Sequence, residues 1–439
     1  MRIPAIPGFD QSAFEKYFKN TGWLMLGRVG SLFIKMVISF AVTNYLGKGQ
    51  NGILNYANSF VIMFMAVAGL GLDSFIVREL VREPQRRDEI LGTSLVLKVI
   101  ASIGIIPVIV LGYLVFPDEH TPVKYVMILS FTGLFQAFNI IDAYFQAQVR
   151  AKFIMYVNIA GNLISALVKF ALILLELPLE YFVGALLFDA FLLAAGYLLI
   201  YRSQNYRIRN WTFSSALARA LLSKSWPLMF AAVLVTIYMK IDQVMIGRIL
   251  GTEALGIYST VVPLSEVWYF IPMSIVGSVF PAIINARAES MDRYQRRLQN
   301  LYDLMVGISL TIAIFMTFAS GFIYDLVYKP EFASGAPVLS LHVWAGIFVF
   351  LGVASGQYLI NEGLTQLSLF RTAVGALVNI LLNLVLLPKF GIIGAAWATL
   401  TAYAFATFSI IFIPRTRDQG IMMIKSLFLI SLIQKLNKR

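Results

Sequence analysis

GWLMLGRVGSLFIKMVISFAVTNY at residues 22–45 and ILNYANSFVIMFMAVAGLGLDSFIV at residues 53–77 set the character of the fold. Each stretch exceeds the roughly 20 apolar residues that an α-helix needs to cross the hydrocarbon layer of a bilayer. Similar stretches recur along the chain almost to Pro414. The sequence therefore predicts an all-α membrane protein that crosses a phospholipid bilayer many times.

The composition supports this prediction. Of the 439 residues, 59% are hydrophobic and 13% are charged, whereas soluble domains are about 45–50% apolar. The chain has no cysteine, which excludes disulfides, thiol catalysis and cysteine-ligated metals. Residues 1–20 lack the apolar core and cleavage site of a signal peptide, so we expect the first span to be retained.

The apolar stretches predict about twelve transmembrane helices. The expected spans are residues 22–45, 53–77, 90–116, 123–146, 153–175, 179–201, 226–250, 255–284, 300–327, 336–360, 366–387 and 392–413.

Lysine and arginine are distributed unevenly between the loops. With the amino terminus inside, 25 of the 35 bases fall in cytoplasmic segments, with Arg371 assigned to the loop after residue 360, and only five fall in outer loops. Basic residues are retained on the cytoplasmic side of a membrane, so both termini should be cytoplasmic. The net charge of +12 thus reflects membrane topology and does not indicate nucleic-acid binding.

The chain contains a weak internal repeat. Leu46-Gly47 with Gly52-Ile53 recurs, 204 residues later, as Leu250-Gly251 with Gly256-Ile257. Repeated halves are common in membrane carriers, which bind substrate between them. We expect an N-terminal lobe (1–201), a cytoplasmic amphipathic linker (202–225), a C-terminal lobe (226–413) and a basic cytoplasmic or interfacial tail (414–439), with six helices in each lobe.

Five bases are left after the assignments to loops and lie inside predicted helices, where a charge costs at least about 2.5–3.5 kcal/mol on insertion scales. Such bases normally face a partner or a water-filled cavity, although a base near a helix end can also reach the headgroups. Together they predict a cationic lining for an anionic substrate. The embedded bases are Arg28, Lys35, Lys98, Lys169 and Lys240.

Polar and acidic residues also lie in predicted spans. The amides suit a hydroxyl-rich ligand or, equally well, hydrogen bonds between helices. The acids are candidates for ion coupling. Gly352 and Gly356 form a small-xxx-small pair that favours close helix packing. The candidate substrate-binding residues are Asn139, Asp142, Gln146, Asn158, Asn162, Asn379 and Asn383, and the candidate coupling acids are Asp189, Asp242 and Glu266.

Two stretches are similar to the polysaccharide-biosynthesis flippases of the O-antigen type: YLGKGQNGILNYANSFVIMFMAVAGLGLDSFIVREL (residues 45–80) and KIDQVMIGRILGTEALGIYSTVVPLSEVWYFIPMSIVGSVFPAI (residues 240–283). The resemblance implies the fold of the multidrug/oligosaccharidyl-lipid/polysaccharide exporter superfamily, with two lobes around a V-shaped central cavity. It also implies transport of a polyprenyl-pyrophosphate-linked oligosaccharide across a bacterial inner membrane, in company with a polysaccharide polymerase and chain-length machinery.

Such a carrier is not an enzyme, and the sequence calls for no cofactor and no metal: its two histidines lack metal-ligand spacing. One alternative is a cation-coupled multidrug exporter of the same superfamily, which would favour acidic and aromatic cavity residues. Another is a membrane glycosyltransferase or glycan polymerase, which tends to need a sizeable outer loop. The predicted outer loops hardly exceed ten residues.

Overall fold

The computed structural model describes residues 11–115 and 117–436, which form helices and turns with no strand among them. Ten helical segments are long and apolar enough to cross a membrane. The prediction of an all-α, multi-pass membrane protein is confirmed. Phe116, which ends the third predicted span, and the bases Arg2, Lys438 and Arg439 lie outside the described residues.

Two of the ten segments each contain two predicted spans. Helix α1 (Gln11–Ala68) is kinked at Gly47, where φ is 70° and ψ is 171°. Helix α15 (Thr365–Phe408) is kinked at Gly391, where φ is 60° and ψ is −146°. Glycine has no Cβ and adopts such positive φ values readily. Because both kinks fall between predicted spans, the ten helical segments account for all twelve predicted spans.

The chain separates into two units that do not follow its two halves. The first comprises Met1–Leu46 and Tyr56–Thr236, and the second comprises Gly47–Asn55 and Ile237–Arg439. Helices α1 and α9 (Ser215–Leu250) therefore contribute to both units. The other helices of the first unit are α2 (Asp73–Arg82), α3 (Arg87–Val115), α4 (Val123–Ser130), α5 (Thr132–Gln136), α6 (Ile140–Ala147), α7 (Ala151–Leu174) and α8 (Leu179–Ser203).

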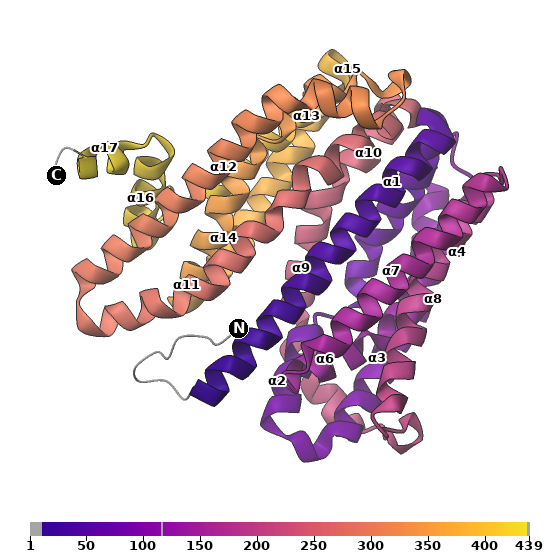
Figure 1. The fold of residues 1–439 in the computed structure, drawn as a ribbon, viewed down its shortest axis with the longest axis horizontal. Coiled ribbons are helices and arrows are strands. Elements are labelled where there is room, and N and C mark those ends of the chain that lie inside the picture. Colours follow the sequence, from indigo (N-terminus) through magenta and orange to yellow (C-terminus); the bar gives the residue numbers. More distant parts are fainter. Residues whose placement is uncertain (1–10, 116, 437–439) are drawn as a thin grey trace. The chain divides into compact units, whose positions relative to one another are not determined.

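The second unit is built in the same way from long apolar helices (Figure 1). Its remaining helices are α10 (Thr252–Glu266), α11 (Phe270–Glu289), α12 (Met291–Val327), α13 (Gly335–His342), α14 (Ala345–Asn361), α16 (Arg417–Leu427) and α17 (Ile430–Leu436).

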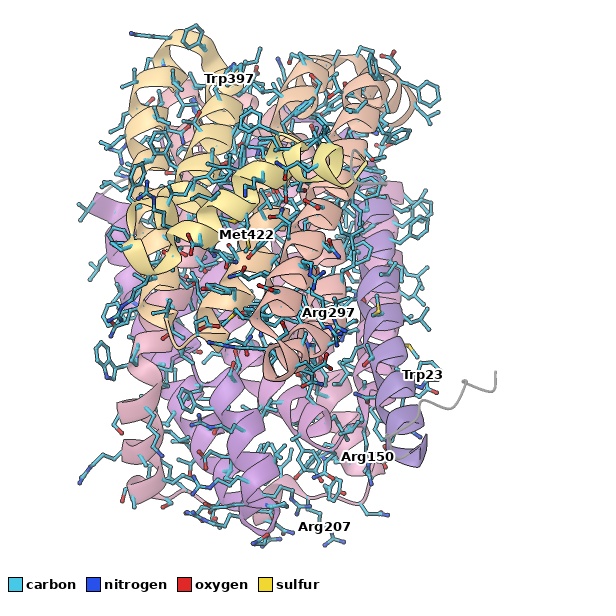
Figure 2. The ribbon with its side chains drawn as sticks, turned by 90° about the vertical axis from the view of Figure 1, so that its left-hand side faces the viewer. Trp23, Arg150, Arg207, Arg297, Trp397 and Met422 are labelled. Atoms are coloured by element: carbon cyan, nitrogen blue, oxygen red, sulfur yellow. The ribbon has the colours of Figure 1, made fainter. Side chains whose placement is uncertain are left out.

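The start of α9 lies in the sequence assigned to the linker. Residues from Ser215 run without a break into the seventh predicted span, and the helix contains Pro227. Residues 215–225 of the predicted linker therefore form the first turns of this helix. In Figure 2, Arg150 and Arg207 lie at the same end of the first unit, as the charge distribution predicts for two loops on one side of a membrane.

Helix α12 has an exposed apolar face that suits contact with lipid and not with water. Phe318, Phe322 and Leu326 recur every four residues on one face and are 84%, 69% and 70% exposed. Residues three or four apart share a helix face, and so large an exposed apolar stripe would favour aggregation in water. The opposite face contributes Tyr302 and Met305, both fully buried, to the core of the second unit.

Two glycines of the internal repeat let helices touch backbone to backbone in the second unit. A Cβ built on Gly52 would lie 1.7 Å from the carbonyl oxygen of Thr252, and one on Gly256 would lie 1.7 Å from that of Lys48. Asn51 strengthens the contact because its Nδ2 donates to the carbonyl oxygen of Gly256 at 3.0 Å. The repeat therefore marks a reciprocal helix contact, which only glycine permits.

The tail consists of α16 and α17, two short helices that are not among the membrane-crossing segments. Figure 2 labels Met422 on α16, and its carbonyl oxygen accepts from Gln299 Nε2 of α12 at 3.1 Å. Ser426 Oγ donates to the buried Asp303 carboxylate of α12 at 2.6 Å. These bonds hold the tail against α12 within the second unit.

Candidate functional site

A charged cluster in the first unit joins α1, α7 and α8. Lys169 Nζ donates to Ser165 Oγ at 3.0 Å and forms an ion pair with Asp189. Ser165 Oγ also donates to the Asp189 carboxylate. The charges of Asp189 and Lys169 both act on Lys35. Lys35 is exposed and has no ion pair among the described residues, so this cluster presents one uncompensated base.

Lys98 lies in α3 and forms an ion pair with Asp73, the first residue of α2. Only 5% of Lys98 is exposed. The side chain of Asp73 is 72% exposed, so it carries the negative charge out to the surface of the unit. Lys98 is therefore neutralised by a neighbour, and the prediction that it helps to bind substrate gains nothing from the structure.

Asp142 of α6 is the centre of a second polar group in the first unit. Gln146 Nε2 donates to its carboxylate at 3.1 Å. Tyr197 of α8 interacts with Asp142 and with Asn158 of α7, and the charge of Arg28 in α1 acts on Asp142. Arg28 is exposed and belongs to no ion pair within the described ranges. Four of the predicted site residues are thus gathered in one place.

Two further predicted amides lie apart from these contacts. Asn139 ends the short 3-10 turn Ala137–Asn139 and is half-buried. Asn162 of α7 is 8% exposed.

The second unit contains a buried network of oxygen atoms across α9, α10 and α15. Asp242 is 5% exposed and accepts from Tyr258 Oη at 2.6 Å. Tyr258 also interacts with Thr399, whose Oγ1 lies 3.5 Å from Asn379 Nδ2. Asn383 Nδ2 donates to Asn379 Oδ1 at 2.9 Å. Three predicted residues thus belong to one chain of contacts.

Part of this network has unused hydrogen-bonding capacity. Asn383 is fully buried, and its Oδ1 has no partner in the part of the chain that the structure describes. Buried polar atoms are nearly always hydrogen-bonded, so this oxygen is an acceptor that lacks a donor. Asp242 likewise has no base within 4.0 Å among these residues. A carboxylate with amide and hydroxyl oxygens is a donor set that suits a proton or a hard cation.

Lys240 and Glu266 lie close to Asp242. The charge of Lys240 acts on both acids, and the two acids act on each other. Lys240 is half-buried and forms no ion pair within the described ranges. Lys240 and Asp242 are two residues apart in α9 and lie within electrostatic reach of each other.

The structure therefore separates the five predicted bases into two classes. Lys98 and Lys169 are each paired with an aspartate, whereas Arg28, Lys35 and Lys240 form no ion pair among the described residues. Because a charge in the membrane must be compensated or hydrated, the second class can meet an anion.

We expect the Lys169–Asp189 pair to be structural. Lys169→Met and Asp189→Asn should each lower the stability of the protein by roughly 1–3 kcal/mol, because each leaves a partly buried charge alone. The double variant should recover most of this loss. The midpoint of thermal unfolding in detergent measures the coupling. A double variant that unfolds at no higher temperature than the single variants would contradict a direct ion pair between Lys169 and Asp189.

The Lys124–Glu180 pair provides the control. It joins side chains that are 56% and 47% exposed at 3.0 Å. Exposed ion pairs contribute about 0–1 kcal/mol. Lys124→Met should therefore change the unfolding midpoint far less than Lys169→Met.

Sequence reasoning missed Arg371, Asp73 and Tyr258. Arg371 was counted in a cytoplasmic loop, but it lies inside α15. The signal was present, because residue 371 falls within the predicted span 366–387. Asp73 and Tyr258 carried no such signal, because their partners are 25 and 16 residues away in the sequence.

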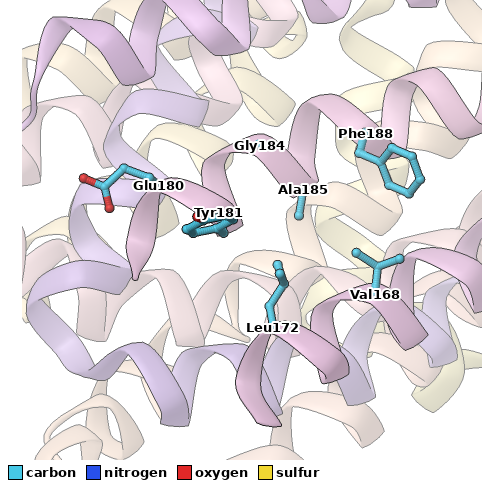
Figure 3. Close-up of a pocket in the computed structure, with 7 residues that line it drawn as sticks. All are labelled: Val168, Leu172, Glu180, Tyr181, Gly184, Ala185 and Phe188. Carbon is cyan, nitrogen blue, oxygen red and sulfur yellow. The ribbon is translucent and has the colours of Figure 1, made fainter. Parts of the chain in front are cut away.

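A groove between α7 and α8 has a different character (Figure 3). Its volume is about 340 Å³, and its lining is almost entirely apolar. The charged residue at its edge is Glu180, which is paired with Lys124. The groove therefore offers nothing to a sugar or a phosphate and suits a hydrocarbon chain. Its lining residues are Val168, Leu172, Glu180, Tyr181, Gly184, Ala185 and Phe188.

Solved structures share the fold of this chain. The fold matches an inward-facing multidrug resistance MATE family transporter of the MOP superfamily, with a TM-score of 0.71 and 12% identity over 95% of this chain and 99% of that one. It matches the lipid II flippase MurJ in an inward closed conformation equally well, with a TM-score of 0.71 and 16% identity over 95% and 93%. The predicted superfamily fold is confirmed.

The family follows from the sequence match. The model of the polysaccharide biosynthesis protein family matches residues 17–287, which is more than half of the chain. The chain belongs to this family, and the resemblance seen in its sequence is confirmed. A second model, MatE, matches residues 227–385.

Three archaeal proteins are similar to the chain. The probable flippase AglR of Haloferax volcanii is 23% identical over 85% of this chain and 78% of its own length. The probable low-salt glycan biosynthesis flippase Agl15 of the same organism is 24% identical over 39% and 36%. An uncharacterized membrane protein of Methanocaldococcus jannaschii is 27% identical over 44% and 38%. The chain thus matches little more than a third of the length of two of these relatives.

Proposed function

We propose that this protein is a flippase that carries a polyprenyl-pyrophosphate-linked oligosaccharide from the cytoplasmic to the outer leaflet by alternating access. The observation that carries the proposal is the set of embedded bases without an ion pair among the described residues, Arg28, Lys35 and Lys240. A diphosphate is the part of the substrate that needs such bases. Membership of the polysaccharide biosynthesis protein family supports a glycan substrate. The names of AglR, a probable flippase, and Agl15, a probable glycan biosynthesis flippase, support flipping.

The amides and acids have separate parts in this proposal. Asn139, Asp142, Gln146, Asn158 and Asn162 would hold sugar hydroxyls in the first unit. In the second unit, the network around Asp242, Asn379 and Asn383 would couple transport to a proton or cation. Asp189 and Glu266 are weaker coupling candidates, because Asp189 already pairs with Lys169 and Glu266 lies beside Lys240.

The remaining topology is part of the proposal. Both termini would be cytoplasmic, with lobes at 1–201 and 226–413, a linker at 202–225 and a basic tail at 414–439. The named relatives are archaeal. Their names favour a flippase and, for Agl15, glycan biosynthesis, and give no particular support to O-antigen, to an inner membrane or to a polymerase partner.

The test is a flipping assay with the full-length protein in liposomes. The probe is a fluorescent oligosaccharide on a short polyprenyl diphosphate. We expect Lys35→Gln and Lys240→Gln each to slow flipping about tenfold or more, because each removes a charge-assisted contact to phosphate. Lys224→Gln, at an exposed position of α9, is the matched control and should flip normally. Normal flipping by both test variants would remove the cationic mechanism.

A multidrug exporter is the second candidate. The match of residues 227–385 to MatE favours it. The same liposomes can be tested with a cationic dye and an imposed ion gradient. Dye transport by the unmodified protein, without flipping of the lipid-linked sugar, would establish the exporter and reject the flippase.

A further inference from the structure

Arg371 lies inside the second unit, six residues after the first residue of α15. At 1.5 Å per residue, this places it about 9 Å along the helix. Its guanidinium is held by α14: Nη1 donates to Ser355 Oγ at 2.6 Å, and Nη2 donates to the carbonyl oxygen of Gly352 at 3.2 Å. The side chain is half-buried.

The glycine pair of α14 provides the space for this guanidinium. A Cβ on Gly356 would lie 3.2 Å from Arg371 Nη2, closer than about nine in ten real Cβ contacts. A Cβ on Gly352 would meet Thr407 Oγ1 at 3.6 Å, an ordinary contact distance. The small-xxx-small pair therefore leaves space for the guanidinium of Arg371 at Gly356. The sequence predicted only that the pair allows two helices to pack closely.

The charge of Arg371 is not compensated. Both of its hydrogen-bond partners are neutral, and no carboxylate lies within 4.0 Å of it in the described ranges. The ionisable groups that act on it are the phenols of Tyr238 and Tyr302. Tyr302 is fully buried, and its Oη has no partner among the described residues.

An uncompensated arginine within electrostatic reach of an unpaired hydroxyl is an arrangement that a bound anion would complete. A guanidinium has five N–H donors in a planar fork that fits phosphate oxygens. Ser355 and Gly352 occupy part of the fork and fix its orientation, which reduces the entropy lost when an anion binds.

We propose that Arg371, held against Gly352, Ser355 and Gly356 of α14, forms a binding subsite for a phosphate or diphosphate group in the second unit. Its assignment to the diphosphate of a lipid-linked sugar rests on the function proposed above. The same chemistry is found in inorganic diphosphate and in anionic phospholipid headgroups, so the experiment must separate these sources.

The experiment uses the full-length protein in nanodiscs of zwitterionic phosphatidylcholine. Affinities are measured for farnesyl diphosphate and for inorganic diphosphate, and a parallel series contains phosphatidylglycerol in the bilayer. We expect Arg371→Gln to weaken diphosphate binding about tenfold, because it removes a charge-assisted contact. Arg371→Lys should retain part of the affinity, since it keeps the charge and loses the fork.

Two further variants test the contact between Arg371 and α14. Gly356→Ala pushes the guanidinium without changing its charge, and should weaken binding by a smaller factor than Arg371→Gln. Arg415→Gln removes an exposed arginine of the same unit and should leave binding unchanged.

The outcomes separate the possibilities. An Arg371→Gln variant that unfolds at a lower temperature but binds both diphosphates normally would make Arg371 a clamp between two helices, and the subsite would be wrong. Loss confined to phosphatidylglycerol would assign the anion to the bilayer and reject the substrate assignment. Unaffected binding in Arg371→Gln, with lost flipping in Lys35→Gln, would reject the subsite alone. Normal diphosphate binding without flipping by the unmodified protein would reject the flippase alone.

Discussion

Gly256→Ala should unfold at a markedly lower temperature than the unmodified protein and should flip substrate at less than about a tenth of its rate. The added Cβ would lie 1.7 Å from the carbonyl oxygen of Lys48. That oxygen belongs to the backbone, so no side-chain rotation can relieve the overlap and the two helices must separate. Overpacked sites usually cost about 1–3 kcal/mol through side-chain shifts, and a backbone clash should cost more.

The internal repeat gives this prediction two matched tests. Gly52→Ala should be equally harmful, because its Cβ would lie 1.7 Å from the carbonyl oxygen of Thr252. Gly49→Ala is the control, because a Cβ there meets nothing within 4 Å in the same segment. Alanine in a helix is about 0.5–1 kcal/mol more favourable than glycine, so this control should be slightly more stable. Gly52 and Gly256 variants as stable as Gly49→Ala would refute the reciprocal contact.

Asp242→Asn should abolish the response of flipping to an imposed proton or cation gradient and slow driven flipping about tenfold or more. The asparagine keeps the size of the side chain and can still accept from Tyr258, but it removes the buried negative charge. A cation or proton bound there would lose its main electrostatic partner. The readout is the ratio of flipping rates with and without the gradient, together with the unfolding midpoint.

Asp325→Asn is the control for this change. Asp325 lies in α12 of the same unit and is exposed, so its amide should preserve the gradient response. Asp303→Asn tests a buried acid of another kind. Asp303 binds Ser426 of the tail, so its replacement should loosen the tail and leave the gradient response intact. A normal gradient response in Asp242→Asn would exclude Asp242 as the coupling acid.

Much of the fold could be predicted from the sequence because lipid imposes simple rules on helices. Long apolar runs gave the spans, and the kinks at Gly47 and Gly391 fall between predicted spans. The weak repeat also has a structural counterpart. Gly47 and Gly251 adopt nearly the same backbone angles, with φ of 70° and 89° and ψ of 171° in both.

The state of each embedded base could not be predicted, because it depends on contacts between distant residues. Lys98 and Lys35 look alike in sequence, yet Lys98 is paired with Asp73 and Lys35 has no such partner within the described ranges. This difference depends on which helix faces pack against each other. The periodicity of the sequence does not predict that packing. Arg371, by contrast, could have been placed from the sequence, because it falls within the predicted span 366–387 although it was counted with the loop before it.

The sharing of helices between the two units also bears on how the chain is synthesised. The second unit takes residues 47–55 from the beginning of the chain, and the first needs residues up to Thr236. A ribosome therefore cannot release a finished first unit when its sixth span emerges, because part of α9 is still missing. A gene cut near Asn205, at the exposed turn after α8, would yield two polypeptides that each lack a piece of a unit. Neither could fold completely without the other.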